Sequence, residues 1–409
     1  MTPRKTDYDI LIVGGGMVGA SLACALRDRR LRIGVIEAVP FGAASQPGYD
    51  DRSIALAYGT RRIFETMGLW QPLADYATPI RNIHISDRGR FGITRLDAAR
   101  ERVDALGYVI ENRILGALFG AMLAARPDID LLSPATLTGL QIDGDAATVT
   151  INDNGAERTV TTLLLVGADG ANSAVRRLLD IPARRWDYGQ TAIISNVTPG
   201  RPHLGTAYER FTDSGPLALL PMTDNRCALV WTARNEDVDA LMGLGDIKFL
   251  SALQQRFGYR LGRFERIGTR HAYPLSLNRV AAHVRSRVAL IGNAAHTLHP
   301  VAGQGFNLGL RDVAVLAEIV AQTSAGGADP GALTALQRYA QWRRGDQQRV
   351  IAFTDGLVRI FSSPLPPIAW ARNLGLLAVD ILPAAKHLLT RQTMGLAGRQ
   401  TRLARGLPL

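Results

Sequence analysis

A buried strand that leads directly into a glycine-spaced helix start constrains this chain more than any other feature. Residues 8–13 read Tyr-Asp-Ile-Leu-Ile-Val, and Gly14, Gly16 and Gly19 follow as a GxGxxG motif before an apolar helix. In this motif the first glycine makes a tight turn, the second admits a pyrophosphate to the helix N-terminus, and the third lets helix and strand pack closely. The next strand-like run ends in Glu37, eighteen residues after Gly19, where a carboxylate binds the ribose of an adenosine. The pattern predicts an α/β dinucleotide-binding fold.

A second glycine-spaced stretch covers residues 292–312. The strand-like run 287–291 leads into it, and we expect a helix to begin near Asn307. Backbone amides at 303–306 would then meet an anion or a carbonyl at the positive end of that helix, and the glycines would let the backbone approach a planar ring. The stretch therefore predicts contacts to a flavin ring. The residues expected to make them are Asn293, Pro300, Gly303, Gln304, Gly305, Phe306 and Asn307.

A third signature lies at Asp169-Gly170, directly after the apolar run 163–166. Taken alone, this segment is a good turn and helix cap. In a doubly wound sheet, however, the ligand lies outside the carboxyl ends of the strands, so Asp169 would face the same cleft as Gly14. Together with Glu37, these motifs predict that the dinucleotide is FAD.

Composition restricts the alternatives. With 47% apolar residues the chain suits an ordered globular protein. Cys24 and Cys227 show neither CxxC nor metal-ligand spacing, which predicts reduced, buried packing residues and no metal site. The N-terminal residues carry no signal segment and no window is apolar enough to span a bilayer, so we expect a cytoplasmic protein.

The net charge of +11 is compatible with nucleic acid, an anionic membrane or acidic ligands as partners. No interleaved aromatic and basic motif supports nucleic acid. The apolar run 368–382 is followed by basic residues without an acid, namely Lys386, Arg391, Arg399, Arg402 and Arg405. This order suits either a peripheral helix on the inner face of the cytoplasmic membrane or a packing helix with a solvated tail.

Strand-like runs also fill the region between the flavin motifs. Runs at 217–222 and 227–232 flank a Thr-Asp-Asn turn and predict a hairpin, while 191–197 predicts a further strand. We expect this sheet to cover a substrate above the flavin. The expected domains are an FAD-binding domain at 1–180 and 286–363, with 50–110 contributing to the substrate side, a substrate-binding β-sheet domain at 181–285, and a helical region with a basic tail at 364–409.

The order of these motifs resembles that of flavin aromatic hydroxylases with para-hydroxybenzoate-hydroxylase-like folds. The resemblance narrows to the FAD-dependent hydroxylases of ubiquinone biosynthesis and extends from about Tyr8 to Leu396. The segments that carry it are Arg52-Ser-Ile-Ala-Leu, Ala-Tyr208-Glu-Arg-Phe-Thr, Gly215-Pro-Leu-Ala-Leu-Leu-Pro-Met, Ala272-Tyr-Pro-Leu and His299-Pro-Val-Ala-Gly-Gln-Gly. Most members have Asp where this chain has Asn293, a departure typical of the branch that resembles 2-polyprenyl-6-methoxyphenol hydroxylase.

The resemblance implies a fold class, a reaction and further site residues. The fold would be an α/β FAD-binding domain with an inserted β-rich substrate domain and a helical C-terminal region. NAD(P)H would reduce FAD transiently, O2 would add at flavin C4a, and the hydroperoxide would hydroxylate a polyprenylated phenol. Arg52 and Arg113 would contact FAD. Tyr208, Tyr273 and His299, beside Pro300, are candidates for assisting phenol ionisation.

Several alternatives stay open within this frame. The enzyme could hydroxylate another ring position of the same pathway, or the chain could be an accessory flavoprotein that organises a quinone-synthesis assembly without turnover. A disulfide-type flavin reductase is disfavoured because it needs a second dinucleotide fingerprint and a redox CxxC. A flavin halogenase is disfavoured because its tryptophan-rich motif is not visible. Prenyl length, oligomeric state and the choice between NADH and NADPH have no signature in the sequence.

Overall fold

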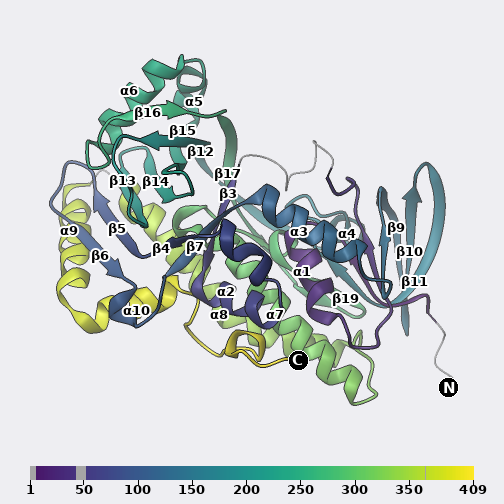
Figure 1. Cartoon of the computed structure of the whole chain (residues 1–409). Helices are drawn as coiled ribbons and strands as arrows, with labels where there is room; N and C mark the ends of the chain where they lie inside the picture. The colour runs from purple at the N-terminus through teal and green to yellow at the C-terminus, as the bar shows by residue number, and fades with distance from the viewer. Residues whose placement is uncertain (1–5, 43–51, 364) are drawn as a thin grey trace.

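The computed structural model describes residues 6–42, 52–363 and 365–409. Residues 50, 51 and 364, which fall within the expected ranges 50–110 and 364–409, lie outside this part of the chain. Two large sheets stand apart in Figure 1, and a third, small sheet lies between them. A continuous set of helices from the second half of the chain runs below all three.

The first large sheet has a parallel centre with strand order β8-β2-β1-β11-β19. Helices α1, α3, α7 and α8 contribute to the core on one face, and β9, β10 and α4 contribute to the core on the other face. Parallel strands buried on both faces read as continuous apolar runs, as β1 and β11 do. The elements are β1 (Tyr8–Val13), α1 (Met17–Leu26), β2 (Ile33–Ile36), α3 (Asn112–Ala124), β8 (Ile129–Leu132), β9 (Ala135–Asp143), β10 (Ala146–Asp153), β11 (Ala156–Gly167), α4 (Ala174–Leu178), β18 (Val284–Arg285) and β19 (Val288–Leu290).

The second large sheet is mixed and draws on three separate parts of the sequence. Its strand order is β20-β17-β12-β15-β14-β13-β5-β6, with β16 beside β12. The predicted hairpin is confirmed, because β14 and β15 pair antiparallel. Helices α5 and α6 cover one face of this sheet. The elements are β5 (Asn82–Asp87), β6 (Ile93–Asp97), β12 (Ala183–Pro199), β13 (Thr206–Thr212), β14 (Gly215–Pro221), β15 (Cys227–Arg234), α5 (Asn235–Met242), α6 (Asp246–Phe257), β16 (Phe264–Ile267), β17 (His271–Val280) and β20 (His296–Thr297).

The small antiparallel sheet, β3-β7-β4, joins the two large ones. Its strands come from the same stretch of sequence as β5 and β6, so this stretch crosses from the first sheet to the second. The connecting elements are β3 (Ser53–Ala57), α2 (Tyr58–Thr66), η2 (Gln71–Tyr76), β4 (Thr78–Ile80), η3 (Ala99–Glu101), β7 (Gly107–Glu111), η4 (Gly292–Ala294) and η5 (Val301–Gly303).

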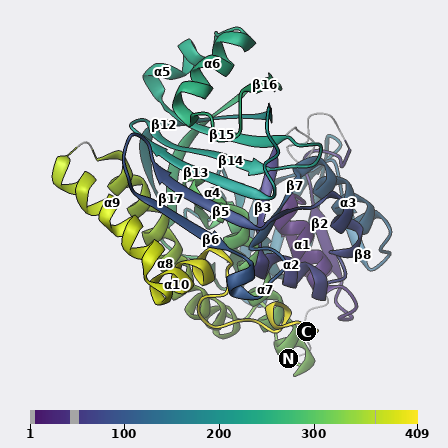
Figure 2. The same ribbon diagram turned by 60° about the vertical axis from the view of Figure 1, so that its left-hand side comes forward.

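Four helices follow the last strand: α7 (Gln304–Ala325), α8 (Leu333–Ser362), α9 (Pro366–Ile381) and α10 (Pro383–Thr393), before the short η6 (Leu403–Arg405). Helix α7 begins at Gln304, three residues earlier than the sequence indicated, because Gly303 ends the preceding turn with a left-handed backbone (φ 60°). Figure 2 shows α9 lying along the edge of the second sheet next to β6. In the described residues no single helix is long and apolar enough to cross a membrane, although α9 and α10, bent by 96°, reach that length and composition together.

Candidate flavin and substrate site

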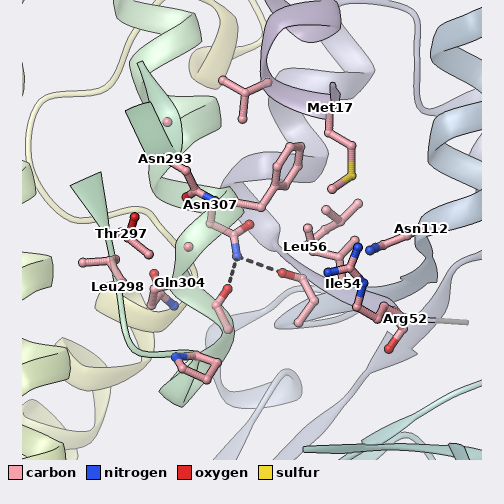
Figure 3. Close-up of a pocket in the computed structure, with 18 of the residues that line it drawn as sticks. Met17, Arg52, Ile54, Leu56, Asn112, Asn293, Thr297, Leu298, Gln304 and Asn307 are labelled. Atoms are coloured by element: carbon pink, nitrogen blue, oxygen red, sulfur yellow. Dashed lines mark hydrogen bonds between the residues drawn. The ribbon is translucent and has the colours of Figure 1, made fainter. Parts of the chain in front are cut away.

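One cavity of about 1040 Å³ lies where the three sheets meet. Its walls come from the carboxyl ends of β1, β2 and β11, from β3, from one face of the second sheet, and from the turn that precedes α7. Helices α8, α9 and α10 close its far end. Figure 3 shows the centre of the cavity, where Asn293, Thr297 and Gln304 lie opposite Met17, Arg52 and Asn112.

The glycine motif has the geometry that its spacing predicts. Gly14 has φ +101°, and an added Cβ would lie 2.6 Å from the Ala168 carbonyl oxygen. A Cβ on Gly19 would lie 1.9 Å from the Gly14 carbonyl oxygen, so only glycine fits against the strand. By contrast, a Cβ on Gly16 meets nothing within 4 Å, because this residue faces open space at the start of α1. That space is where a pyrophosphate would meet the helix N-terminus.

Glu37 stands directly after β2 and borders the cavity beside the glycine turn. Its carboxylate accepts hydrogen bonds from the backbone amides of Gly15 (2.7 Å) and Val39 (2.9 Å). These bonds fix the carboxylate at the end of the strand. The ribose hydroxyls of an adenosine could share its remaining lone pairs.

Asp169 lies at the carboxyl end of β11, on the opposite side of the glycine turn. Its Oδ2 accepts a hydrogen bond from the backbone amide of Val175 (3.1 Å). Its Oδ1 is buried at the cavity wall without a hydrogen-bond partner in the described residues. Since a buried acceptor without a partner costs about 1–3 kcal/mol, this oxygen fits a hydroxyl-bearing ligand such as the ribityl chain. Gly170, with φ +79°, borders the same part of the cavity.

The turn before α7 is held from behind by Asn307. Its side-chain amide donates to the carbonyl oxygens of Gly303 (2.7 Å) and Ala55 (2.8 Å), drawn as dashed lines in Figure 3. Its Oδ1 accepts from the Ala57 backbone amide (2.8 Å) and the Thr60 hydroxyl (2.7 Å). The Asn307 side chain is therefore occupied in fixing the turn, and only its backbone is left for a flavin contact.

A buried charge network, which was not predicted from the sequence, supports the neighbouring cavity segment at Gly292 and Asn293. The Asp312 carboxylate accepts from His296 Nε2 (2.6 Å), the Arg343 guanidinium (2.7 Å) and the Gly292 backbone amide (3.1 Å). Although burial opposes ionisation, His296 and Arg343 hold the pKa of Asp312 below its usual range. The network ties Gly292, and with it Asn293, to α7. Asp312 is the last residue of the glycine-spaced stretch 292–312, and this position was the sequence signal that could have indicated its structural role.

Four further buried oxygens border the cavity without a partner in the described residues. They are Asn112 Oδ1, Thr232 Oγ1, Thr297 Oγ1 and Gln304 Oε1. Asn293 also borders the cavity, and its side chain is exposed to that space. Gly305 and Phe306 line the same wall, and the Phe306 ring packs edge-on against Phe64. These polar atoms fit the pyrimidine edge of a flavin, which carries the carbonyl oxygens and ring nitrogens and lacks the two methyl groups.

The two predicted arginines differ in position. Arg52 lines the cavity, and its guanidinium lies over the ring of Tyr273, 5.0 Å from the centroid. Arg113 is not among the residues that line the cavity, because its side chain is 54% exposed and pairs with Glu111. Its neighbour Asn112 points into the cavity instead. The contact of Arg113 with FAD stays a prediction.

The other end of the cavity is almost entirely apolar. The inner face of the second sheet and helices α8–α10 contribute Ile83, Ile85, Leu96, Phe211, Phe353, Leu357, Phe361, Leu376 and Leu389. The rings of Phe211 and Phe361 stack with centroids 3.6 Å apart and join the sheet to α8. A wall of this kind suits a long hydrocarbon chain. One acidic residue, Glu209, interrupts it.

The residues predicted to assist phenol ionisation do not all line the cavity. Tyr208 borders the cavity, but its ring packs against His84 and Phe257 on the other face of the sheet. His299 is buried behind the turn, where Nδ1 accepts from the Val301 amide (3.2 Å), and burial lowers its pKa to about 4. Neither His299 nor Tyr273 lines the cavity, whereas Pro300 does. Their roles stay predictions.

Both cysteines are buried and unpaired, as predicted. Burial raises the pKa of the Cys24 thiol to about 11 and that of Cys227 to about 12, so neither is a reactive thiolate at neutral pH. In the described parts of the chain, no group of three or more His, Cys, Asp or Glu side chains could hold a metal ion.

The fold and this cavity define an FAD-binding protein of the aromatic-hydroxylase type. The FAD-binding-domain family model, FAD_binding_3, matches residues 7–354. Among solved structures, p-nitrophenol 4-monooxygenase PnpA from Pseudomonas putida superposes with a TM-score of 0.80, covering 97% of this chain and 100% of that one at 18% identity. This likeness concerns the fold.

Sequence relatives narrow the class. The chain is 43% identical to ubiquinone hydroxylase UbiL of Rhodospirillum rubrum, over 98% of this chain and 93% of that protein. It is 32% identical to the 3-demethoxyubiquinol 3-hydroxylase of Escherichia coli, over 97% of this chain and 100% of that enzyme. This chain belongs to the FAD-dependent hydroxylases of ubiquinone biosynthesis, a family of flavin monooxygenases.

Proposed function

We propose that this enzyme hydroxylates the ring of 2-polyprenyl-6-methoxyphenol, with NAD(P)H as transient reductant and O2 as co-substrate. The observation that carries the proposal is the division of one cavity into a polar end and an apolar end. A phenol ring at the junction would lie against the turn at 300–303, and its prenyl chain would extend between the second sheet and α8–α10. Family membership supports the class of substrate.

Backbone amides and two acidic side chains of the cavity wall would hold FAD. The amides at the start of α1 and the open space at Gly16 would bind the pyrophosphate, while Glu37 would bind the adenosine ribose. Asp169 Oδ1 would accept from a ribityl hydroxyl. The amides of 303–306, at the positive end of α7, would face the carbonyl edge of the ring. Bound FAD would supply redox chemistry and oxygen activation.

Exclusion of water is the second task of the protein. Water in this space would divert the oxygen chemistry that bound FAD supplies toward peroxide, so the chain's own residues would have to keep water out. The aromatic and aliphatic side chains of α8–α10 close the far end of the cavity. A prenyl chain in that space would complete the seal, so the substrate itself would protect the reaction.

The ring position is the open question within the family, since one relative bears the name 3-demethoxyubiquinol 3-hydroxylase. The test supplies FAD-loaded enzyme with NAD(P)H, O2 and either short-chain 2-prenyl-6-methoxyphenol or a short-chain 3-demethoxyubiquinol. We expect a product 16 mass units heavier from the first substrate, which NMR would assign to a ring carbon. Product from the second substrate alone would replace our proposal with the other ring position.

An accessory flavoprotein role predicts a different outcome. A bulky side chain at Gly16 would fill the pyrophosphate space, so Gly16→Trp should exclude FAD. We expect this variant to fail to restore quinone synthesis in a deletion strain. Restored synthesis by a folded, FAD-free variant would show that turnover is not the contribution of the protein.

We also propose that the enzyme contacts the membrane that holds its substrate. The apolar side chains of α9 and α10 would make this contact, and the basic C-terminal residues would not. Lys386 is only 8% exposed, and its ammonium pairs with Asp380 at 2.7 Å. Arg399 stacks over the Trp342 ring at 3.7 Å. The exposed side of α9 and α10, in contrast, carries large apolar side chains: Ile368, Trp370, Leu374, Ile381, Leu382 and Leu388.

This apolar face is the outer side of α9 and α10, and the inner side of the same helices lines the far end of the cavity. Figure 2 shows these helices at the edge of the second sheet. Exposed apolar patches of this kind mark interaction surfaces. Flotation with phosphatidylethanolamine and phosphatidylglycerol vesicles tests the contact. We expect Trp370→Ser with Leu374→Ser to reduce vesicle binding about tenfold, and Arg402→Gln with Arg405→Gln to change it less. The reverse order would restore the basic-tail interpretation.

A further inference from the structure

Glu209 occupies a position that no cofactor contact accounts for. It lies in β13, where it pairs with Ala218 of β14 and Ile85 of β5. Because side chains alternate along a strand, Glu209 shares its face with Ala207 and Phe211, and all three line the cavity. Among the described lining residues from the second sheet, Glu209 is the one charged side chain.

The carboxyl group lies against the turn that precedes α7. The backbone amide of Ala302 is its hydrogen-bonding neighbour. Ala302 has a left-handed backbone (φ 59°, ψ 16°), a conformation that costs a residue with a Cβ about 1–2 kcal/mol. Strain of this kind tends to persist at functional sites because the surrounding structure imposes it. Glu209 and the strained turn therefore meet where the polar end of the cavity joins the apolar end.

The surroundings of Glu209 favour a proton-accepting carboxyl. Glu209 is partly exposed to the cavity, and desolvation by the surrounding protein raises its pKa to about 7, while the Ala302 amide opposes the shift. A carboxylate with a raised pKa is a stronger base than one in water. Such shifts concentrate at active sites, although buried structural groups also show them.

Charged and titratable groups on the neighbouring elements face elsewhere. His84 of β5 and Arg210 of β13 lie on the opposite face of the sheet, where Arg210 donates to the Phe257 carbonyl oxygen (2.7 Å). Asp355 of α8 accepts from the Tyr188 hydroxyl (3.2 Å). His299 on the turn is neutral at pH 7 because burial lowers its pKa to about 4. None of these groups faces the cavity beside the Glu209 carboxyl, so none of them competes with it for the proton of a phenol there.

We propose that the Glu209 carboxylate accepts the proton of the substrate's phenol hydroxyl. This inference rests on the proposed function, because it requires a phenol at the junction of the two cavity ends. It also replaces the tyrosines and His299 as the group that assists ionisation. Tyr273 and His299 do not line the cavity, and the Tyr208 ring packs on the outer face of the sheet. Glu209 lines the cavity on the inner face, where its carboxylate can accept a proton.

The protons and electrons balance, because NAD(P)H would supply the two electrons with which the second atom of O2 leaves as water. The phenol O–H bond breaks, its proton binds to Glu209, and the resulting phenolate makes the ring carbon more nucleophilic toward the oxygen that the bound cofactor supplies. When the ring becomes aromatic again, the ring carbon loses its hydrogen as a proton to water. Glu209 then returns its proton to the original phenol oxygen. Glu209 ends the cycle as a carboxylate, and the ring has gained one oxygen atom.

The first test compares wild type with Glu209→Gln in the FAD-loaded enzyme. Glutamine keeps the shape and a hydrogen bond but cannot accept the proton. We expect hydroxylation to fall by about 100-fold or more, the usual contribution of a general base, while FAD content stays unchanged. NAD(P)H oxidation should continue with release of hydrogen peroxide. Glu265→Gln, an exposed glutamate on β16 of the same sheet, serves as the matched control and should act as wild type.

A second readout separates proton transfer from a structural effect. Ring-fluorinated 2-prenyl phenols are more acidic, so they need less help from a base. The loss in Glu209→Gln should shrink steadily as phenol acidity increases, and Glu209→Asp should recover part of the rate. In the wild type, kcat/KM should fall as the pH drops below about 7, where the carboxyl becomes protonated. This acid limb should disappear in Glu209→Gln.

Two outcomes would overturn the assignment. Equal hydroxylation rates and pH profiles in wild type and Glu209→Gln would exclude Glu209 as the base. A loss that is independent of phenol acidity would make it a structural residue. If Glu209→Gln fails to fold, the wild type alone decides, because an absent acid limb with the non-fluorinated phenol also contradicts the proposal. Failure of the wild type to hydroxylate any prenylated phenol would instead refute the proposed function.

Discussion

The two ends of the cavity are built by different means. At the flavin end, short contiguous motifs present backbone amides and buried acceptors such as Asp169 Oδ1 and Thr297 Oγ1. At the substrate end, isolated side chains from β5, β13 and α8–α10 form an apolar wall with a single acid, Glu209. The first end is specified locally in the sequence, and the second by long-range packing. A change at the flavin end should therefore affect every activity, whereas a change at the substrate end should affect selectivity and coupling.

The largest expected effect is at the glycine turn. In Gly19→Val the new Cβ would lie 1.9 Å from the Gly14 carbonyl oxygen, so α1 must move away from the strand. We expect a loss of more than about 3 kcal/mol in the free energy of unfolding and no bound FAD. Flavin absorbance and thermal unfolding measure both. Gly345→Ala in α8, where a Cβ meets nothing within 4 Å, is the control and should be neutral or slightly stabilising. FAD retention by Gly19→Val would contradict the local specification of this end.

At the junction of the two ends, stability should depend on pH. Burial raises the pKa of Glu209 from 4.5 to about 7, so the folded state holds a proton that the unfolded state loses. The stability that comes from this proton is fully present below about pH 4.5. It is lost as the pH rises from about 4.5 to about 7. Glu209→Gln should exceed wild type in stability at pH 8 by about 1–3 kcal/mol, and the difference should shrink toward pH 5. A constant difference across this range would show that Glu209 titrates normally.

A smaller effect is expected from one flavin contact. Asp169→Ala removes the buried oxygen that we assign to a ribityl hydroxyl. FAD should bind about 10-fold to 100-fold more weakly, equivalent to about 1–3 kcal/mol, by fluorescence titration of the apoprotein. Glu236→Ala, on the exposed surface of α5, is the control. Unchanged affinity would move the ribityl contact to another of the buried acceptors.

The smallest effect belongs to the apolar wall. Leu389→Trp should narrow the far end of the cavity, while Leu388→Trp adds the same ring on the outer surface of α10, where residue 388 is 70% exposed. We expect Leu389→Trp to raise KM about tenfold for a long prenyl chain and hardly at all for a short one. Leu388→Trp should leave both values unchanged. Equal effects on both chain lengths would place the prenyl chain elsewhere.

The same contrast explains what the sequence could predict. Gly14, Gly16, Glu37 and Asp169 were predicted as FAD contacts because each follows a strand at fixed spacing, and spacing is a local property; all four line the cavity. Glu209 was present in a segment used for the family resemblance, yet the role that we propose for it was not predicted. The signal was an acid alternating with Ala207 and Phe211 on an otherwise apolar strand face. Which face looks inward depends on parallel pairing with β5, more than 100 residues earlier in the chain.

Two basic side chains show what else the sequence left open. Arg113, predicted to contact FAD at the start of α3, pairs with Glu111, while its neighbour Asn112 lines the cavity, and its contact with FAD stays a prediction. The basic residues from Lys386 onward were predicted either to meet anionic lipid or to form a solvated tail, but Lys386, in α10, folds back onto Asp380 of α9. The partner of Arg113 is the acid at the end of β7 and that of Lys386 is an acid on α9, and in each case the partner determines the direction of the side chain.

The coupling ratio, product formed per NAD(P)H oxidised, tests the central claim most directly. It should be measured with one 2-substituted 6-methoxyphenol that carries a prenyl chain and with the same phenol without it. If the apolar end completes the site, the ratio should approach one with the prenylated phenol and fall toward zero, with hydrogen peroxide as product, without the chain. Equal ratios for both phenols would contradict the account, because the flavin end alone would then support hydroxylation.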